Sequence, residues 1–150
     1  MNNLKSFNEF IIESKKNLLD SWSSDLKEHG IESIFTNTKN IIQSDYNQYQ
    51  KALNKYIKDN KIKGTIYDIL EKLPLENINA NKLVASQEWL NVSTVKYFIK
   101  NPNKISTDNS DTPSIIEYNG NYWIKDGHHR LAAAIILGNN KIKARVLYLG

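Results

Sequence analysis

Five consecutive residues late in the chain combine the side chains that a phosphate site needs: Asp126, Gly127, His128, His129 and Arg130. Two of the three histidines and one of the two arginines of this 150-residue chain fall in this run. Arginine offers phosphate oxygens a fixed cationic fork, glycine lets the backbone approach a ligand, and imidazoles donate hydrogen bonds or move protons near neutral pH. Aspartate can orient an imidazole, hold Mg²⁺ or accept a proton from an attacking hydroxyl.

The elements around this run place it where a strand meets a helix. Two runs rich in β-formers flank an Asn-Gly turn, an apolar helix ended by a glycine follows the motif, and a closing strand completes the chain. These segments are Ser114–Tyr118, Asn119-Gly120, Asn121–Lys125, Leu131–Leu137, Gly138 and Ile142–Leu149. Asn-Gly is a strong hairpin signal, and a helix start presents unpaired amides and positive dipole to an anion. The motif is therefore predicted to bind phosphate at a helix amino end.

The same residues also have structural and metal-binding interpretations. Taken singly, an Asp-Gly pair is typical of a turn, and a histidine before an apolar helix is typical of a cap or a satisfied core residue. Zinc is not expected, because adjacent histidines on a helix point about 100° apart and no further histidine lies nearby. The chain has no cysteine, which excludes disulfides, thiolate metal sites and a cysteine nucleophile.

The stretch from Pro113 to Leu149, with its hairpin and Asp-Gly-His-His-Arg motif, resembles the N-terminal domain of ParB partition proteins and the related sulfiredoxins. The upstream segment Leu83–Gln87 and the helix Val92–Ile99 fit the same pattern, so the resemblance covers about residues 76–150. It implies a small α/β domain in which Gly127, His128, His129 and Arg130 contact the phosphates of ATP or another nucleoside triphosphate with Mg²⁺.

The departures from this family narrow the expected activity. Sulfiredoxins carry a catalytic cysteine where this chain has His128, so sulfinic-acid repair is excluded. Partition proteins continue into a helix-turn-helix, whereas this chain ends at Gly150, so centromere recognition is not expected. Free serine kinases of the same fold are similar to this chain in keeping an Asp-Gly-His-x-Arg motif. They also use an upstream glutamate, and the nearest residues here, Gln87 and Glu88, do not identify it.

The expected function is therefore nucleotide binding with phosphoryl transfer or nucleoside triphosphate hydrolysis. Asp126 would be the base or the Mg²⁺ ligand, and His128 the proton donor or a phosphate contact. A nuclease or DNA-binding domain, holding a backbone phosphate in the same pocket, is the first alternative. A non-enzymatic interaction or virion protein is the second.

The first half of the chain is predicted to be helical. Amphipathic helices are expected over Ser6–His29, Ile41–Lys58 and Thr65–Lys72, and Gly30 suits the end of the first of them. Ile42, Tyr46, Tyr49, Leu53, Tyr56 and Ile57 fall on one side of the second helix. The predicted class is α+β: a helical extension over residues 1–73, then a small ParB/sulfiredoxin-like domain with a mixed sheet over residues 74–150. The helices are expected to pack, to bind a protein partner or to self-associate.

The segment Leu4–Ser14 resembles, more weakly, the leader that directs internal proteins into the heads of tailed phages, where a protease cuts after a site like Ile11-Ile12-Glu13. A capped amphipathic helix explains the same residues. The net charge of +4 comes mostly from scattered lysines, which permits a nucleic-acid partner without indicating one. No membrane span or secretory signal is predicted, so the expected location is the bacterial cytoplasm, with the phage head interior as the alternative.

Overall fold

The computed structural model describes residues 28–105 and 112–149. Residues 1–27, which hold most of the first predicted helix and the Ile11-Ile12-Glu13 site, lie outside the described residues, as do residues 106–111 and 150. In the part that is described, no helix is long and apolar enough to cross a bilayer.

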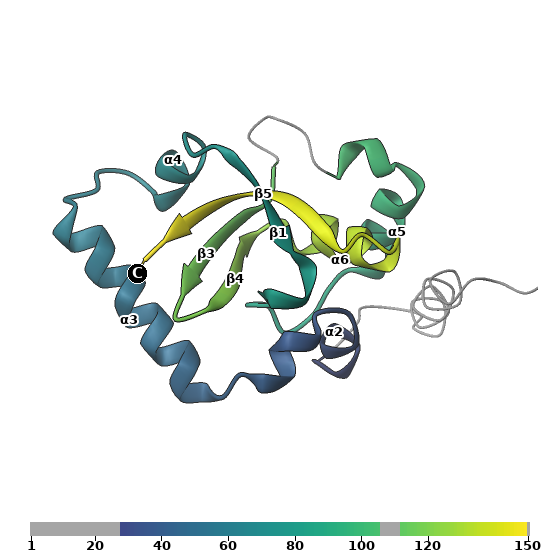
Figure 1. The fold of residues 1–150 in the computed structure, drawn as a ribbon, viewed down its shortest axis with the longest axis horizontal. Helices are drawn as coiled ribbons and strands as arrows, with labels where there is room; N and C mark the ends of the chain where they lie inside the picture. Colours follow the sequence, from purple (N-terminus) through teal and green to yellow (C-terminus); the bar gives the residue numbers. More distant parts are fainter. Residues whose placement is uncertain (1–27, 106–111, 150) are drawn as a thin grey trace, which may run out of the picture.

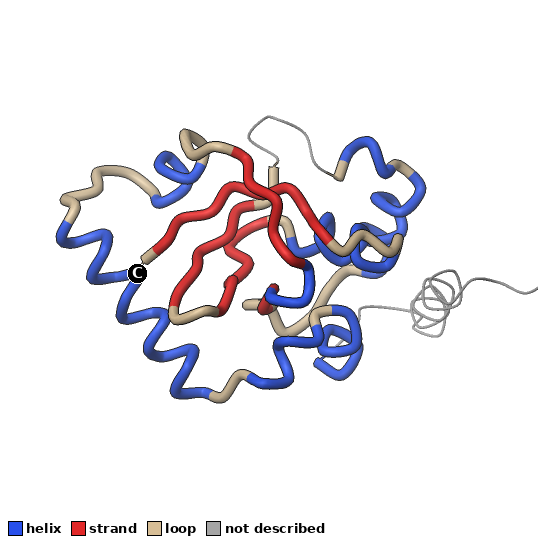
Figure 2. Tube along the Cα trace, viewed as in Figure 1, coloured by secondary structure: helices blue, strands red, loops and turns tan. Residues whose placement is uncertain are grey.

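Five strands form one mixed sheet at the centre of the molecule (Figures 1 and 2). The strands are β1 (Leu75–Asn79), β2 (Leu83–Val84), β3 (Ser114–Tyr118), β4 (Asn121–Asp126) and β5 (Lys141–Tyr148). Their order across the sheet is β1-β5-β3-β4-β2. The β1–β5 and β3–β4 pairs are antiparallel, whereas β3–β5 and β2–β4 are parallel. The expected α+β class with a mixed sheet is confirmed.

In the part of the chain that the structure describes, helices cover both faces of this sheet. The α-helices are α2 (Glu28–Ile34), α3 (Gln43–Asp59), α4 (Ile66–Leu70), α5 (Val92–Lys100) and α6 (His128–Ile136). Short 3₁₀ turns are η1 (Thr36–Asn40), η2 (Ala80–Lys82) and η3 (Pro102–Lys104). Successive strand residues point to opposite faces, so Ile115 joins the apolar cluster of α2, α5 and α6, whereas Ile116 joins that of α3 and α4.

Helices α3 and α4 pack directly on the sheet. Tyr49 of α3 is 1% exposed and stacks on Trp123 of β4, with ring centroids 4.5 Å apart and an interplanar angle of 4°. Leu53 of α3 and Leu70 of α4 are buried in the same cluster. The helices α3 and α4, before residue 74, and the strands after it therefore share one apolar core.

The hairpin and the helix after it form for local reasons. Asn119 and Gly120 both have positive φ values, 55° and 84°, which suits a two-residue turn whose twist matches that of the strands. At the end of α6, Gly138 has a φ of 87° and the Asn139 amide donates to the carbonyl of Ala134, as in a Schellman motif. Both predictions are confirmed.

Two sequence predictions for the first half need correction. Gly30 does not end the first helix, because α2 runs through it to Ile34, and the buried Ile31 and Ile34 offset the intrinsic cost of glycine in a helix. The apolar side predicted for the second helix is buried only in part, because Ile42, the N-cap of α3, is 64% exposed and Tyr46 is 37% exposed.

The short edge strand β2 is covered by η1. The Thr38 hydroxyl accepts from the Ala85 amide at 3.0 Å, and the Asn37 amide group donates to the Lys82 carbonyl at 3.2 Å. These side chains satisfy backbone groups beside an edge that would otherwise invite pairing with another chain. They also fix the path of the chain that continues from β2 into Ser86.

Candidate functional site

The motif lies at the junction of β4 and α6, as expected. Asp126 ends β4 and is exposed, Gly127 is the N-cap of α6, and the helix begins at His128. Gly127 has a φ of 97°, in the left-handed region, and a Cβ added to it would lie 2.9 Å from the Cβ of Pro113. Only glycine meets both the backbone conformation and the close approach without strain.

His128 is buried and serves as a hydrogen-bond acceptor. Its ring is 3% exposed, its Nε2 accepts from the Ser86 amide at 3.0 Å, and its edge meets Phe35. The Ser86 hydroxyl lies 3.3 Å from the same nitrogen, yet it donates to the Ile124 carbonyl at 2.6 Å. Burial, and to a smaller extent neighbouring His129, lowers the pKa of His128 to about 3. A neutral, buried imidazole holds Ser86 in place and is a poor proton donor, which differs from the role expected from sequence.

His129 links the starts of α5 and α6. Its Nε2 accepts from the backbone amide of Asn91 at 3.1 Å. Asn91 is the N-cap of α5, where its side-chain oxygen accepts from the amide of Thr94 at 2.9 Å. Since His129 is the second residue of α6, the amino ends of the two helices lie beside each other, and the helices pack along one another (Figure 1).

Arg130 fixes the far end of α5. Its guanidinium carbon lies 4.7 Å from the centroid of the Phe98 ring, and Nη1 donates to the Lys104 carbonyl at 3.1 Å. The three consecutive side chains of His128, His129 and Arg130 thus hold three separate points of the 86–104 segment. The motif orders this segment, which the sequence did not indicate.

Asp126 has a neighbour in Tyr67 that the sequence did not indicate. The pKa of Tyr67 on α4 is raised, first by burial and then by the negative charge of Asp126. Nζ of Lys125 lies 5.8 Å from the centroid of the same ring. Tyr67 lies in the helical half of the chain and carries no motif, so only its position in the fold brings it to the site.

The acidic and histidine side chains give a limited set of metal ligands. Across residues 28–105 and 112–149, no group of three or more His, Cys, Asp or Glu side chains could hold a metal ion. A Mg²⁺ ion in nucleotide sites commonly takes one or two carboxylates, with waters and substrate phosphates as its other ligands. Asp126, exposed at the end of β4, fits that kind of binding.

The amino end of α6 has the features of an anion site. The first amides of a helix have no partner within the helix, and Gly127 has no side chain to cap them. The first turn of α6 contains no acidic residue. The start of α5 adds a second positive helix end nearby, through the His129–Asn91 bond.

No protein-family model, curated protein or solved structure matches this chain.

Proposed function

We propose that this protein binds the phosphate groups of a nucleoside triphosphate, with Mg²⁺, at the adjoining amino ends of α5 and α6. The observation that carries the proposal is the His129–Asn91 hydrogen bond, which holds two helix starts side by side next to an exposed aspartate. Two positive helix ends favour a multiply charged anion more than one does.

In this proposal the residues of the motif have different roles. Backbone amides at the start of α6, reached over Gly127, would donate to phosphate oxygens. Asp126 would hold Mg²⁺, which neutralises phosphate charge and polarises the terminal phosphorus toward attack. His128, His129 and Arg130 would act mainly by positioning the 86–104 segment around the ligand. Transfer or hydrolysis of the terminal phosphoryl group is the reaction class that such a site serves.

Titration calorimetry with ATP, GTP, CTP and UTP tests this proposal, in Mg²⁺ and again in EDTA. In Mg²⁺, Asp126→Asn should weaken binding by roughly tenfold, because it removes a charged metal ligand. In EDTA the same change should leave binding equal or tighter, because the aspartate then only repels phosphate. Asp59→Asn, at an exposed site in α3 paired with Lys55, is the matched control and should match the wild type in both buffers.

Absence of binding for all four nucleotides in both buffers would overturn the proposal. Equal affinities of wild type and Asp126→Asn in Mg²⁺ would remove Asp126 as the metal ligand. Binding of an oligonucleotide with strong salt dependence, and of no free nucleotide, would move the phosphate site to a nucleic-acid backbone instead.

A further inference from the structure

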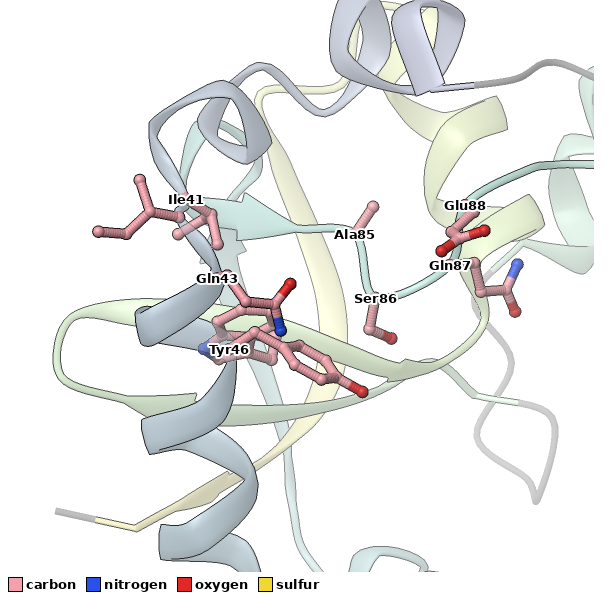
Figure 3. A pocket seen from close by; sticks show the side chains of 9 residues that line it. Ile41, Gln43, Tyr46, Ala85, Ser86, Gln87 and Glu88 are labelled. Atoms are coloured by element: carbon pink, nitrogen blue, oxygen red, sulfur yellow. The ribbon is translucent and has the colours of Figure 1, made fainter.

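A cavity of about 410 Å³ lies between the amino end of α3 and the segment after β2 (Figure 3). Gln43 and Tyr46 line it from α3, and Ser86 and Glu88 line it from the opposite segment, with Trp123 of β4 also in its wall. In Figure 3 the Tyr46 hydroxyl points from α3 toward the segment that carries Ser86. This volume falls within the range of sites that take small molecules.

Several polar groups of the cavity can accept hydrogen bonds. The Ser86 hydroxyl donates its proton to the Ile124 carbonyl at 2.6 Å, so it offers the cavity only lone pairs. The Gln43 amide nitrogen donates one of its two hydrogens to Asn47 at 3.1 Å, and its carbonyl oxygen is an acceptor. Glu88 is the one formally charged residue among the nine that line the cavity. A ligand group with N–H donors, and without negative charge, suits the Glu88 carboxylate.

Tyr46 offers a flat apolar surface for that group. Its ring is 37% exposed, and it meets Trp123 edge-on, with centroids 5.8 Å apart and an interplanar angle of 63°. Tyr49 already stacks on Trp123, so Tyr46 is the ring that a planar ligand can cover. Aromatic faces bind planar heterocycles by stacking.

Ser86 joins this cavity to the proposed phosphate site. Its amide donates to Nε2 of His128, the first residue of α6, while its side chain lines the cavity. The cavity wall and the first residue of α6 are therefore joined by one hydrogen bond.

We infer that the cavity takes the base of the nucleotide and selects guanine, an inference that rests on the proposed function. The Watson–Crick edge of guanine presents N1–H and the N2 amino group, two adjacent donors that a carboxylate such as Glu88 can accept together. Adenine and cytosine place a ring-nitrogen acceptor beside their amino group, and uracil flanks its N–H with two carbonyls. Each of these bases would leave a lone pair facing the carboxylate, which costs affinity.

The test compares GTP, ATP, CTP, UTP and free guanosine by titration calorimetry on the full chain. The wild type should bind GTP about tenfold or more tightly than the other three nucleotides, and it should bind guanosine detectably. Glu88→Gln should reduce the preference for GTP to about twofold or less, because GTP binds more weakly while ATP, whose ring nitrogen no longer faces a carboxylate, binds equally or more tightly. Tyr46→Ala should weaken all nucleotides, whereas Glu71→Gln, at an exposed position after α4, should change none.

The outcomes separate this inference from the proposed function. Equal affinities for the four nucleotides would overturn guanine selection while supporting phosphate binding. A GTP preference that survives Glu88→Gln would also overturn it. Guanosine binding that Glu88→Gln abolishes, without any nucleotide binding, would support the base cavity and overturn the phosphate site. Loss of all binding in the wild type would overturn both.

Discussion

Gly127 meets two separate demands at the start of α6. Its left-handed φ of 97° turns the chain from β4 into the helix, and its missing Cβ leaves room for Pro113. Gly120, in the hairpin turn, has a similar φ of 84° but no atom within 4 Å of an added Cβ. Alanine substitutions at the two positions therefore distinguish the cost of backbone strain from the cost of steric contact.

Gly120→Ala should lower the free energy of unfolding by about 1 kcal/mol, the cost of a left-handed alanine. Gly127→Ala should cost about 1–3 kcal/mol more, because Pro113 must also move. Urea denaturation of both variants measures the difference. Equal losses would mean that Pro113 yields without cost.

His128 should make stability depend on pH. Burial, with a smaller effect of His129, lowers its pKa from 6.5 to about 3, so below pH 6.5 the unfolded chain binds a proton that the native state does not. Its contribution to stability is therefore complete above pH 6.5 and falls as the pH decreases toward 3.

Between pH 6.5 and 5.5 this residue should cost the wild type about 1 kcal/mol of unfolding free energy. His128→Gln, which cannot titrate, should lack that part of the slope even if its overall stability is lower. Urea denaturation at both pH values gives the comparison. Parallel slopes for the two proteins would show that His128 is not held neutral by the fold.

At the scale of elements, α5 and α6 act as a pair whose amino ends are fixed together. The cap of α5 is the Asn91 side chain, which accepts from both the amide and the hydroxyl of Thr94, at 2.9 and 3.0 Å. The Asn91 amide is held from the other side by His129. The proposed phosphate site needs both helix starts in this arrangement.

Asn91→Ala should destabilise the protein by about 1 kcal/mol, because the first turn of α5 loses its cap. Asn91→Ser, whose hydroxyl can accept from the same amide, should stay within a few tenths of a kcal/mol of the wild type. Thermal or urea unfolding of the two variants distinguishes them. A loss as large for serine as for alanine would assign the effect to something other than capping.

At the scale of the whole molecule, the helices before residue 74 and the strands after it share one apolar cluster. Tyr49 and Leu53 of α3 are buried against Trp123 and Ile116 of the sheet. Elements that share a core of this kind tend to open together. The chain from α3 to β5 should therefore unfold as one cooperative unit.

Tyr49→Ala should reduce the opening free energy of Leu53 in α3 and of Ile116 in β3 by the same amount, about 3 kcal/mol, in native-state hydrogen exchange. Lys51→Ala, at an exposed position of α3, is the control and should leave both near their wild-type values. A loss confined to Leu53 would instead support a separate helical extension ending at residue 73.

The elements next to the motif could be predicted from sequence because their causes are local. The Asn119-Gly120 turn, the continuous apolar run of α6 and the glycine at each end of that helix need no distant partner. The extent of α2 could not be predicted, because burial of Ile31 and Ile34 against other elements overrides a local glycine signal.

The sequence by itself determined that Asp126 to Arg130 lie where a strand turns into a helix, since turn residues and periodicity act over a few positions. Only the tertiary structure decided what those side chains contact. His128, His129 and Arg130 bond to residues 42, 38 and 26 positions away, and the cavity joins α3 to the segment after β2. Such partners depend on how separate segments pack, which no local pattern encodes.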